Sequence, residues 1–159
     1  MAAMPITRDG HERLTEQLER LKTTERRTLA EQIQHALATH GNAAETFEYQ
    51  QAREEQELLE RRIAVLERAL LGTEVVEPDA SNGLVDVGER VRVRELETGK
   101  RVELMLVGPL EADPLDGKVS TVSPVGRALL GRRRGEVAAV DAPAGRMHYK
   151  ILAVDVAAA

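Results

Sequence analysis

The sequence predicts an α+β protein in which an antiparallel coiled-coil hairpin is followed by a small antiparallel β domain with one short helix. Residues 7–40 contain no proline and only one glycine, and they are rich in residues that form helices well. From about residue 77 the pattern changes to short runs in which apolar and polar residues alternate. The expected boundaries are a hairpin over residues 1–76 with its tip at 40–45, a linker over 77–83, and a β domain over 84–159.

The first helix of the hairpin is expected to begin after Thr7, because threonine is a favourable N-cap residue. An apolar stripe then follows the helical period, with one long step from Leu21 to Leu29. A step of eight residues departs from a heptad repeat, so we expect the stripe to drift around the helix at this place. The residues of the stripe are Leu14, Leu18, Leu21, Leu29, Ile33, Ala36 and Leu37.

The second helix carries a more regular stripe, with spacings of three and four residues that are typical of a coiled-coil seam. The segment between the two helices is short, so the helices should pack as antiparallel neighbours. Gln56 is the one polar residue in the stripe and could fix the register of the pair. The stripe comprises Tyr49, Ala52, Gln56, Leu59, Ile63, Leu66 and Leu70.

The second half of the chain predicts a small antiparallel sheet with a helix inserted in it. Residues 90–94 alternate strictly between arginine and valine, and residues 102–107 and 149–156 are further candidate strands. Ser123 followed by Pro124 suits the first positions of a helix, and Gly131 suits its C-terminal end. Residues 77–83 have the composition of a turn-forming linker, and residues 75–82 could act as a hinge between the two domains.

Composition excludes several classes of function. The chain has no cysteine, so disulfides and thiolate metal sites are excluded. A net charge of −5 and a single Phe with two Tyr disfavour stable direct DNA binding and base-stacking platforms. No apolar run approaches the length of a membrane span. We therefore expect a monomeric cytoplasmic protein without a cofactor, a metal of its own or a membrane partner.

Motifs along nearly the whole chain resemble those of the bacterial Gre transcript cleavage factors. They are Met4-Pro5-Ile6-Thr7 with Gly10, His40-Gly41-Asn42 with Glu45, Glu48-Tyr49, Ala52-Arg53-Glu54, Glu111-Ala112-Asp113, Ser123-Pro124, Ala128-Leu129-Leu130-Gly131 and Tyr149-Lys150-Ile151-Leu152. The resemblance implies an FKBP-like second domain that docks on bacterial RNA polymerase beside its secondary channel. The hairpin would then enter the channel and bring its tip close to the RNA 3′ end. By the same resemblance, the docking surface would contain Ser123, Pro124, Ala128 and Leu129.

The tip departs from the family pattern at one position. Cleavage-competent relatives carry Gly-Asp-x-x-Glu, whose two carboxylates help to hold the second magnesium ion, whereas this chain carries Asn42 and keeps Glu45. A neutral amide holds a hard cation less strongly than a carboxylate, and Ala43 and Ala44 supply no substitute. We therefore predict a non-enzymatic regulator with no catalytic residue. The alternative is a weakly active cleavage factor in which Glu45 contacts the polymerase magnesium.

A purely structural interpretation accounts for the same tip residues. Asn42 is a favourable N-cap, and Glu45 three positions later could complete a capping box for the second helix. Gly41 could end the first helix in a left-handed conformation. Under this interpretation Asn42 has no catalytic role, while Glu45 could both cap the helix and contact the metal site.

Basic residues supply further candidate contacts. Arg26, Arg27 and Arg53 could contact the wall of the channel. A solvated helix face explains Arg26 and Arg27 better, and a salt bridge across the hairpin explains Arg53 equally well. Residues 132–134 are three consecutive arginines, for which an acidic polymerase surface is a better partner than DNA. A coiled-coil chaperone or adaptor unrelated to transcription is the remaining alternative.

Overall fold

A computed structural model describes residues 3–39 and 46–156 of the chain. The chain divides into two compact units, of which one comprises Glu12–Gly72 and the other comprises Met1–His11 together with Thr73–Ala159. The sequence placed the whole of residues 1–76 in the hairpin. The structure instead groups the N-terminal residues and residues 73–76 with the sheet.

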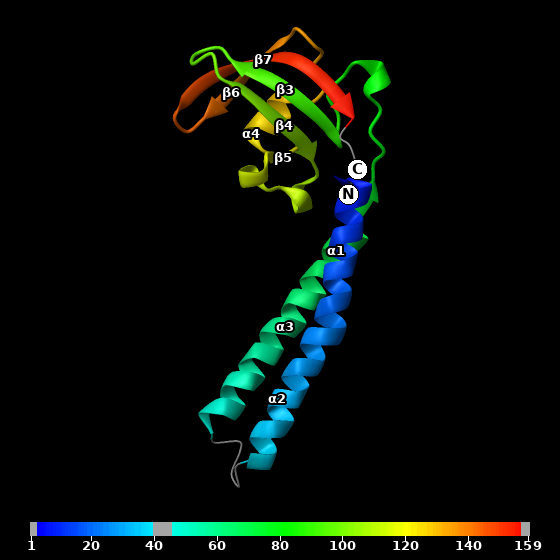
Figure 1. The fold of residues 1–159 in the computed structure, drawn as a ribbon, viewed down its shortest axis with the longest axis vertical. Coiled ribbons are helices and arrows are strands. Elements are labelled where there is room, and N and C mark those ends of the chain that lie inside the picture. The colour runs from blue at the N-terminus through cyan, green and yellow to red at the C-terminus, as the bar shows by residue number, and fades with distance from the viewer. Residues whose placement is uncertain (1–2, 40–45, 157–159) are drawn as a thin grey trace. The chain divides into compact units, whose positions relative to one another are not determined.

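The hairpin consists of two long antiparallel helical arms (Figure 1). The first arm is continuous but contains one π-helical turn, at the place where the apolar stripe was expected to drift between Leu21 and Leu29. The extra residue of a π turn rotates the stripe back toward the partner arm, so Ile33 and Ala36 are buried again. The helical segments are α1 (Arg8–Arg20), η1 (Leu21–Glu25), α2 (Arg26–Thr39) and α3 (Phe47–Leu71).

The seam of the hairpin is apolar, as the sequence predicts. Leu18 and Leu21 of the first arm pack with Leu59 and Ile63 of the second, and each is at most 9% exposed. Leu37 is the exception, because it is 45% exposed beside the buried Ala36. Gln56 does not pair across the seam: its Oε1 accepts a hydrogen bond from Arg53 on the same helix at 2.8 Å.

A five-stranded sheet forms the centre of the other unit, with the order β5-β4-β3-β7-β6. Three of its pairings are antiparallel, as expected, whereas the short β5 pairs parallel with β4. The predicted strands at 90–94, 102–107 and 149–156 are present, whereas β5 and β6 were not predicted. The strands are β3 (Glu89–Glu95), β4 (Arg101–Val107), β5 (Lys118–Ser120), β6 (Val137–Ala142) and β7 (Gly145–Val156).

The core of this unit lies on one face of the sheet. Val91 and Val93 alternate with arginines along β3 and are at most 1% exposed, so the predicted alternation is confirmed. The short helix α4 (Pro124–Leu129) is present as predicted and contributes Leu129 to this core. Gly131 adopts a φ of 79°, the left-handed conformation that suits the residue after a helix C-cap.

A short parallel pair joins the N-terminal segment to the chain that follows the hairpin. Strand β1 (Met4–Ile6) pairs with β2 (Thr73–Val75), so Val75, the first residue of the expected hinge, lies in a paired strand. Neither strand was predicted, because three residues carry too little periodicity to be recognised. The linker region also contains the 3-10 helix η3 (Ala80–Asn82).

The carboxylate of Glu111 anchors the start of α1 within this unit. It is 8% exposed and accepts hydrogen bonds from the backbone nitrogens of Thr7 and Gly108, both at 3.0 Å. The Thr7 hydroxyl also donates to it and in turn accepts from Gly10 N at 3.0 Å, so Thr7 caps α1 as predicted. A methyl group at Gly10 would collide with this carboxylate, which explains the glycine inside the first helical turn.

Glu89 is a buried acid that should make stability depend on pH. Its side chain is fully buried, Oε2 accepts from Asp86 N at 2.9 Å, and Oε1 has no hydrogen-bond partner among the residues described. Burial raises the pKa of Glu89, and the nearby Asp86 and Asp79 carboxylates act in the same direction. A raised pKa gives stability that is complete below the unfolded-state pKa and is lost as pH rises through the folded-state pKa.

We therefore expect Glu89→Gln to stabilise the protein at alkaline pH, because the amide removes the buried charge. At pH 8 its Tm should exceed that of the wild type by about 2–4 °C, the shift that corresponds to roughly 1 kcal/mol in a chain of this size. At pH 4 the difference should be smaller. Thermal unfolding followed by circular dichroism at both pH values measures this, and an equal difference at the two values would contradict it.

In the part of the chain that the structure describes, no helix is long and apolar enough to cross a membrane.

Candidate functional site

The end of the hairpin at which the chain passes from one arm to the other was the main candidate site. Here α2 ends at Thr39 and α3 begins at Phe47, while Asn42, Ala43, Ala44 and Glu45 lie outside the described residues. The N-cap of α3 is Thr46, whose hydroxyl accepts from Tyr49 N at 3.3 Å. Thr46 therefore supplies the N-cap of α3, while Asn42 and Glu45, the capping box considered from the sequence, lie outside the described residues.

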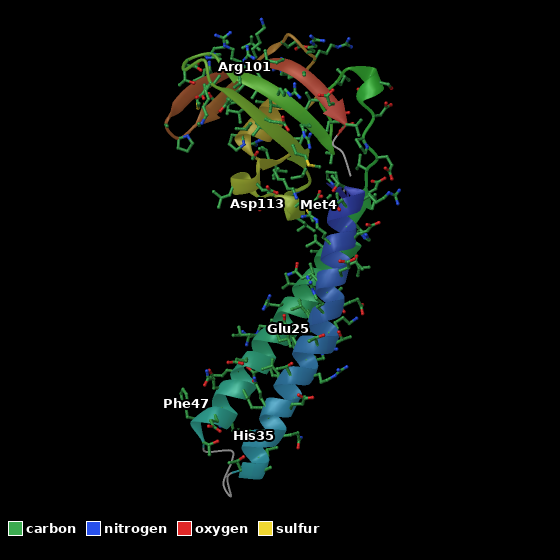
Figure 2. The ribbon with its side chains drawn as sticks, viewed as in Figure 1. Met4, Glu25, His35, Phe47, Arg101 and Asp113 are labelled. Atoms are coloured by element: carbon green, nitrogen blue, oxygen red, sulfur yellow. The ribbon has the colours of Figure 1, made fainter. Side chains whose placement is uncertain are left out.

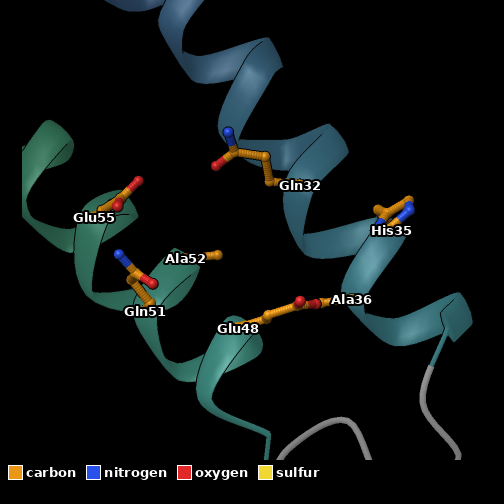
Figure 3. A pocket seen from close by; sticks show the side chains of 7 residues that line it. All are labelled: Gln32, His35, Ala36, Glu48, Gln51, Ala52 and Glu55. Carbon is orange, nitrogen blue, oxygen red and sulfur yellow. The ribbon is translucent and has the colours of Figure 1, made fainter.

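A polar hollow of about 380 Å³ lies between the two arms near this end (Figure 3). Two alanines face each other at the seam, Ala36 at 2% and Ala52 at 6% exposure, and their small side chains leave the space open. The rim carries two acids, one imidazole and two amides. These residues are Glu48, Glu55, His35, Gln32 and Gln51.

The rim can accept and donate hydrogen bonds, but it does not form a metal centre. Within residues 3–39 and 46–156, no group of three His, Asp or Glu side chains is arranged to hold an ion. Glu48 occupies the first turn of α3, where a carboxylate is favoured by the helix dipole. The described residues of the hairpin therefore offer acids at the approach to the tip without a metal site of their own.

The three arginines proposed as channel contacts have different surroundings. Arg26 forms a two-pronged pair with Glu60 of α3, at 2.8 and 2.9 Å, and this hydrogen bonding raises the pKa of Arg26 and lowers that of Glu60. Arg53 donates to Gln56 and makes no ion pair across the hairpin with a described residue. Arg27 is exposed and has no ion pair with any described residue. A channel contact therefore remains a prediction for each, with Arg27 the least engaged.

Phe47 is an exposed aromatic residue beside the candidate site that was not singled out from the sequence. It is the only phenylalanine of the chain, occupies the first position of α3 and is 80% exposed (Figure 2). Its apolar side chain is displayed next to the tip at a position that Thr46 fixes through the helix cap. Its exposure could have been predicted from the spacing. Phe47 lies two positions before the seam residue Tyr49, and residues two apart on a helix do not share a face.

The expected docking residues are grouped around α4, but they are not equally accessible. Ser123 caps the helix, accepting from Gly126 N at 3.1 Å and donating to Ser120 O at 2.7 Å. Pro124 is exposed, and Ala128 is half-buried. Leu129 is only 1% exposed and belongs to the core, so its place on a docking surface is corrected. Apolar side chains that do reach the surface beside α4 are Val122 at 62% and Leu130 at 43% exposure.

Both halves of the chain match models of known protein families. Residues 4–75 match the family described as transcription elongation factor, N-terminal (GreA_GreB_N), and residues 80–156 match transcription elongation factor, GreA/GreB, C-term. The chain belongs to the GreA/GreB family. Transcription elongation factor GreA of Clostridium acetobutylicum is 41% identical over 150 residues, which cover 94% of each chain. That of Thermodesulfovibrio yellowstonii is 41% identical over 152 residues, covering 95% of this Gre factor and 96% of the relative.

Solved structures of similar chains are also known. The GreA factor homolog 1 (Gfh1) protein of Thermus thermophilus is 29% identical and covers 96% of this chain and 98% of its own, with a TM-score of 0.42. The family assignment excludes the alternative of an adaptor unrelated to transcription, and this Gre factor is an RNA polymerase-binding elongation factor.

The prediction that the chain has no enzymatic activity is contradicted. Its relatives at about 40% identity are named transcription elongation factor GreA, and they match over nearly the full length of both chains. The prediction rested on one amide in place of one carboxylate. A single substitution within a fully matched chain does not remove it from a family of cleavage factors.

Proposed function

We propose that this Gre factor enters the secondary channel of bacterial RNA polymerase with its hairpin and promotes transcript cleavage with Glu45 as the only acid of the tip motif. With one carboxylate in place of two, it would act more slowly than relatives that carry both. The observation that carries the proposal is the tip sequence Gly41-Asn42-Ala43-Ala44-Glu45 on an otherwise matched scaffold.

The start of α3 supports a functional role for the tip residues. Because Thr46 caps the helix, neither Asn42 nor Glu45 is needed to begin it. We therefore attribute the acid at position 45 to chemistry outside the hairpin. A carboxylate oxygen is a favourable ligand for Mg²⁺, and a second metal ion can stabilise the attacking and leaving oxygens of a phosphodiester.

The hairpin itself supports a rigid delivery of this acid. The seam is apolar and closed at Leu18, Leu21, Leu59 and Ile63, and Arg26 and Glu60 tie the arms together on the surface. The sheet unit would hold the factor on the polymerase through the exposed residues around α4, with Pro124, Val122 and Leu130 as contacts in place of Leu129.

The amide at position 42 favours a second, regulatory consequence. A factor that occupies the channel but cleaves slowly would compete with relatives that carry two tip acids. We expect it to slow the rescue of stalled complexes when it is added in excess over such a relative. Unchanged rescue at every ratio would exclude this competition.

Glu45→Ala is the test of the proposed function. In complexes of RNA polymerase with a backtracked transcript, the wild type should release 3′ RNA fragments faster than polymerase alone, and Glu45→Ala should return the rate to that of polymerase. A loss of about tenfold corresponds to roughly 1.4 kcal/mol of transition-state stabilisation. Glu54→Ala is the matched control, because Glu54 is an exposed acid further along α3. Wild-type protein that binds polymerase but does not accelerate cleavage would refute the proposal.

A further inference from the structure

The outer face of the sheet, which lies opposite the core, carries a row of cations that face one another. Arg94 on β3 is directly opposite Arg101 on β4 and directly opposite Lys150 on β7. Residues in register on neighbouring strands place their side chains on the same face, so three positive charges meet across three strands. Figure 2 shows Arg101 on the sheet.

These three cations have no side-chain partner in the part of the chain that the structure describes. Among residues 3–39 and 46–156, Arg94, Arg101 and Lys150 form no ion pair or side-chain hydrogen bond, and all three are exposed. The neighbouring acids are already engaged, since Glu103 pairs with Arg90 at 2.9 Å and Glu97 pairs with His148 at 2.6 Å. Like charges directly opposite each other reduce the stability of a sheet. This row therefore lowers stability, and no ion pair with a described residue compensates for it.

A hollow of about 480 Å³ adjoins this row. Arg92, Arg101 and Arg134 line it together with Glu103, and Leu152 and Ala153 supply apolar surface. The pairing of β3 with β7 shifts register between Arg92 and Val93, which leaves Leu152 as an extra residue in β7. Such a bulge bends the strand and is often found beside a binding site. Arg134, the last of the three consecutive arginines, likewise has no ion pair with a described residue.

We infer that this outer face, defined by Arg94, Arg101, Lys150 and Arg134, binds an acidic segment of a protein partner. The face itself shows how a carboxylate is held: Glu103 lies between Arg90 and Arg92, at 2.9 and 3.6 Å. At the next row toward the β3–β4 turn, the position that Glu103 fills is occupied by Arg101. A carboxylate from outside would restore the pattern, and arginine can bind it through two parallel hydrogen bonds.

Carboxylates fit this face better than the phosphates of a nucleic acid. The chain carries a net charge of −5, which repels a long polyanion, whereas a short acidic segment senses mainly the charges within a Debye length of about 8 Å. No Phe, Tyr or Trp side chain lies on this face to stack on bases, because Tyr149 packs against the core and Phe47 and Tyr49 are in the hairpin. The imidazole of His148 is paired with Glu97. The inference concerns the sheet unit and does not depend on cleavage by the tip.

Binding of a fluorescein-labelled peptide of twelve alternating Glu and Ser residues to the full chain tests the inference by fluorescence anisotropy at about 50 mM salt. The triple variant Arg94→Gln, Arg101→Gln, Lys150→Gln should bind about 5- to 50-fold more weakly, since three exposed ion pairs contribute modestly each. The matched control replaces three exposed arginines of the hairpin, Arg20→Gln, Arg62→Gln and Arg68→Gln, and should change affinity less than about twofold.

Four outcomes would overturn the inference. The first two are no binding of the peptide to the wild type at 1 mM protein, and an equal loss of affinity in the hairpin control variant. The other two are tighter binding of a twelve-nucleotide uridine RNA than of the peptide, and a lower Tm for the triple variant than for the wild type. The last follows because relief of like-charge repulsion should leave the Tm unchanged or raise it. A lower Tm would mean that the three cations hold the fold together.

Discussion

Asn42→Asp is expected to raise the rate of transcript cleavage by roughly 10- to 100-fold, which corresponds to about 1.4–2.8 kcal/mol of transition-state stabilisation. The change converts a neutral amide into a carboxylate of the same size and restores the pair of tip acids found in cleavage-competent relatives. Two carboxylates hold a hard divalent cation more strongly than one, because Mg²⁺ favours anionic oxygen ligands. The measurement is the release of 3′ RNA fragments from backtracked complexes at saturating factor.

The gain should depend on both acids. Asn42→Asp combined with Glu45→Ala should lose most of it, because one carboxylate alone again contacts the ion. Asn42→Ala is the control for steric effects at the tip, and it should cleave no faster than the wild type. If Asn42→Asp binds polymerase as tightly as the wild type yet cleaves at the same rate, the electrostatic explanation of the tip is wrong.

The helical hairpin could be predicted well because its signals are periodic and local. The seam of α3 follows three- and four-residue spacings, and every residue of the stripe predicted for this helix is buried or half-buried. The π turn at Leu21–Glu25 was visible only as a long step in the stripe. The N-cap at Thr46 was not predicted, because several residues near this turn are favourable N-caps and sequence alone does not determine how many residues the turn contains.

The parts of the fold that depend on long-range contacts were not predictable from the sequence. The strands β1 and β2 have three residues each. They form by pairing with each other, although they are far apart in the sequence. The outer basic face was also hidden, since Arg94, Arg101 and Lys150 are brought together only by the register of three strands. Leu129 was placed on a surface because its motif resembles a docking segment, although the helical period of α4 turns it toward the core.

The anchor at Glu111 combines both kinds of information. Its motif was recognised from the family resemblance, but its role became clear only from the contacts that join residues 7 and 111. Glu111 and Thr7 are 104 positions apart, and the carboxylate satisfies two backbone donors and one hydroxyl that would otherwise be buried without partners. The start of α1 is therefore held in place by a residue that no local pattern connects to it.

Glu111→Ala is accordingly expected to destabilise the sheet unit by about 2–5 kcal/mol, since it leaves two buried backbone N–H groups unsatisfied at roughly 1–3 kcal/mol each. Urea unfolding followed by circular dichroism gives the loss, and hydrogen exchange at the amides of Thr7 and Gly108 should accelerate with it. Asp116→Ala is the matched control, because that carboxylate is 68% exposed and should change stability by less than about 0.5 kcal/mol. Glu111→Gln keeps one acceptor oxygen and should fall between the two. Equal stability of Glu111→Ala and Asp116→Ala would mean that the N-terminal segment is held by the pairing of β1 with β2 alone.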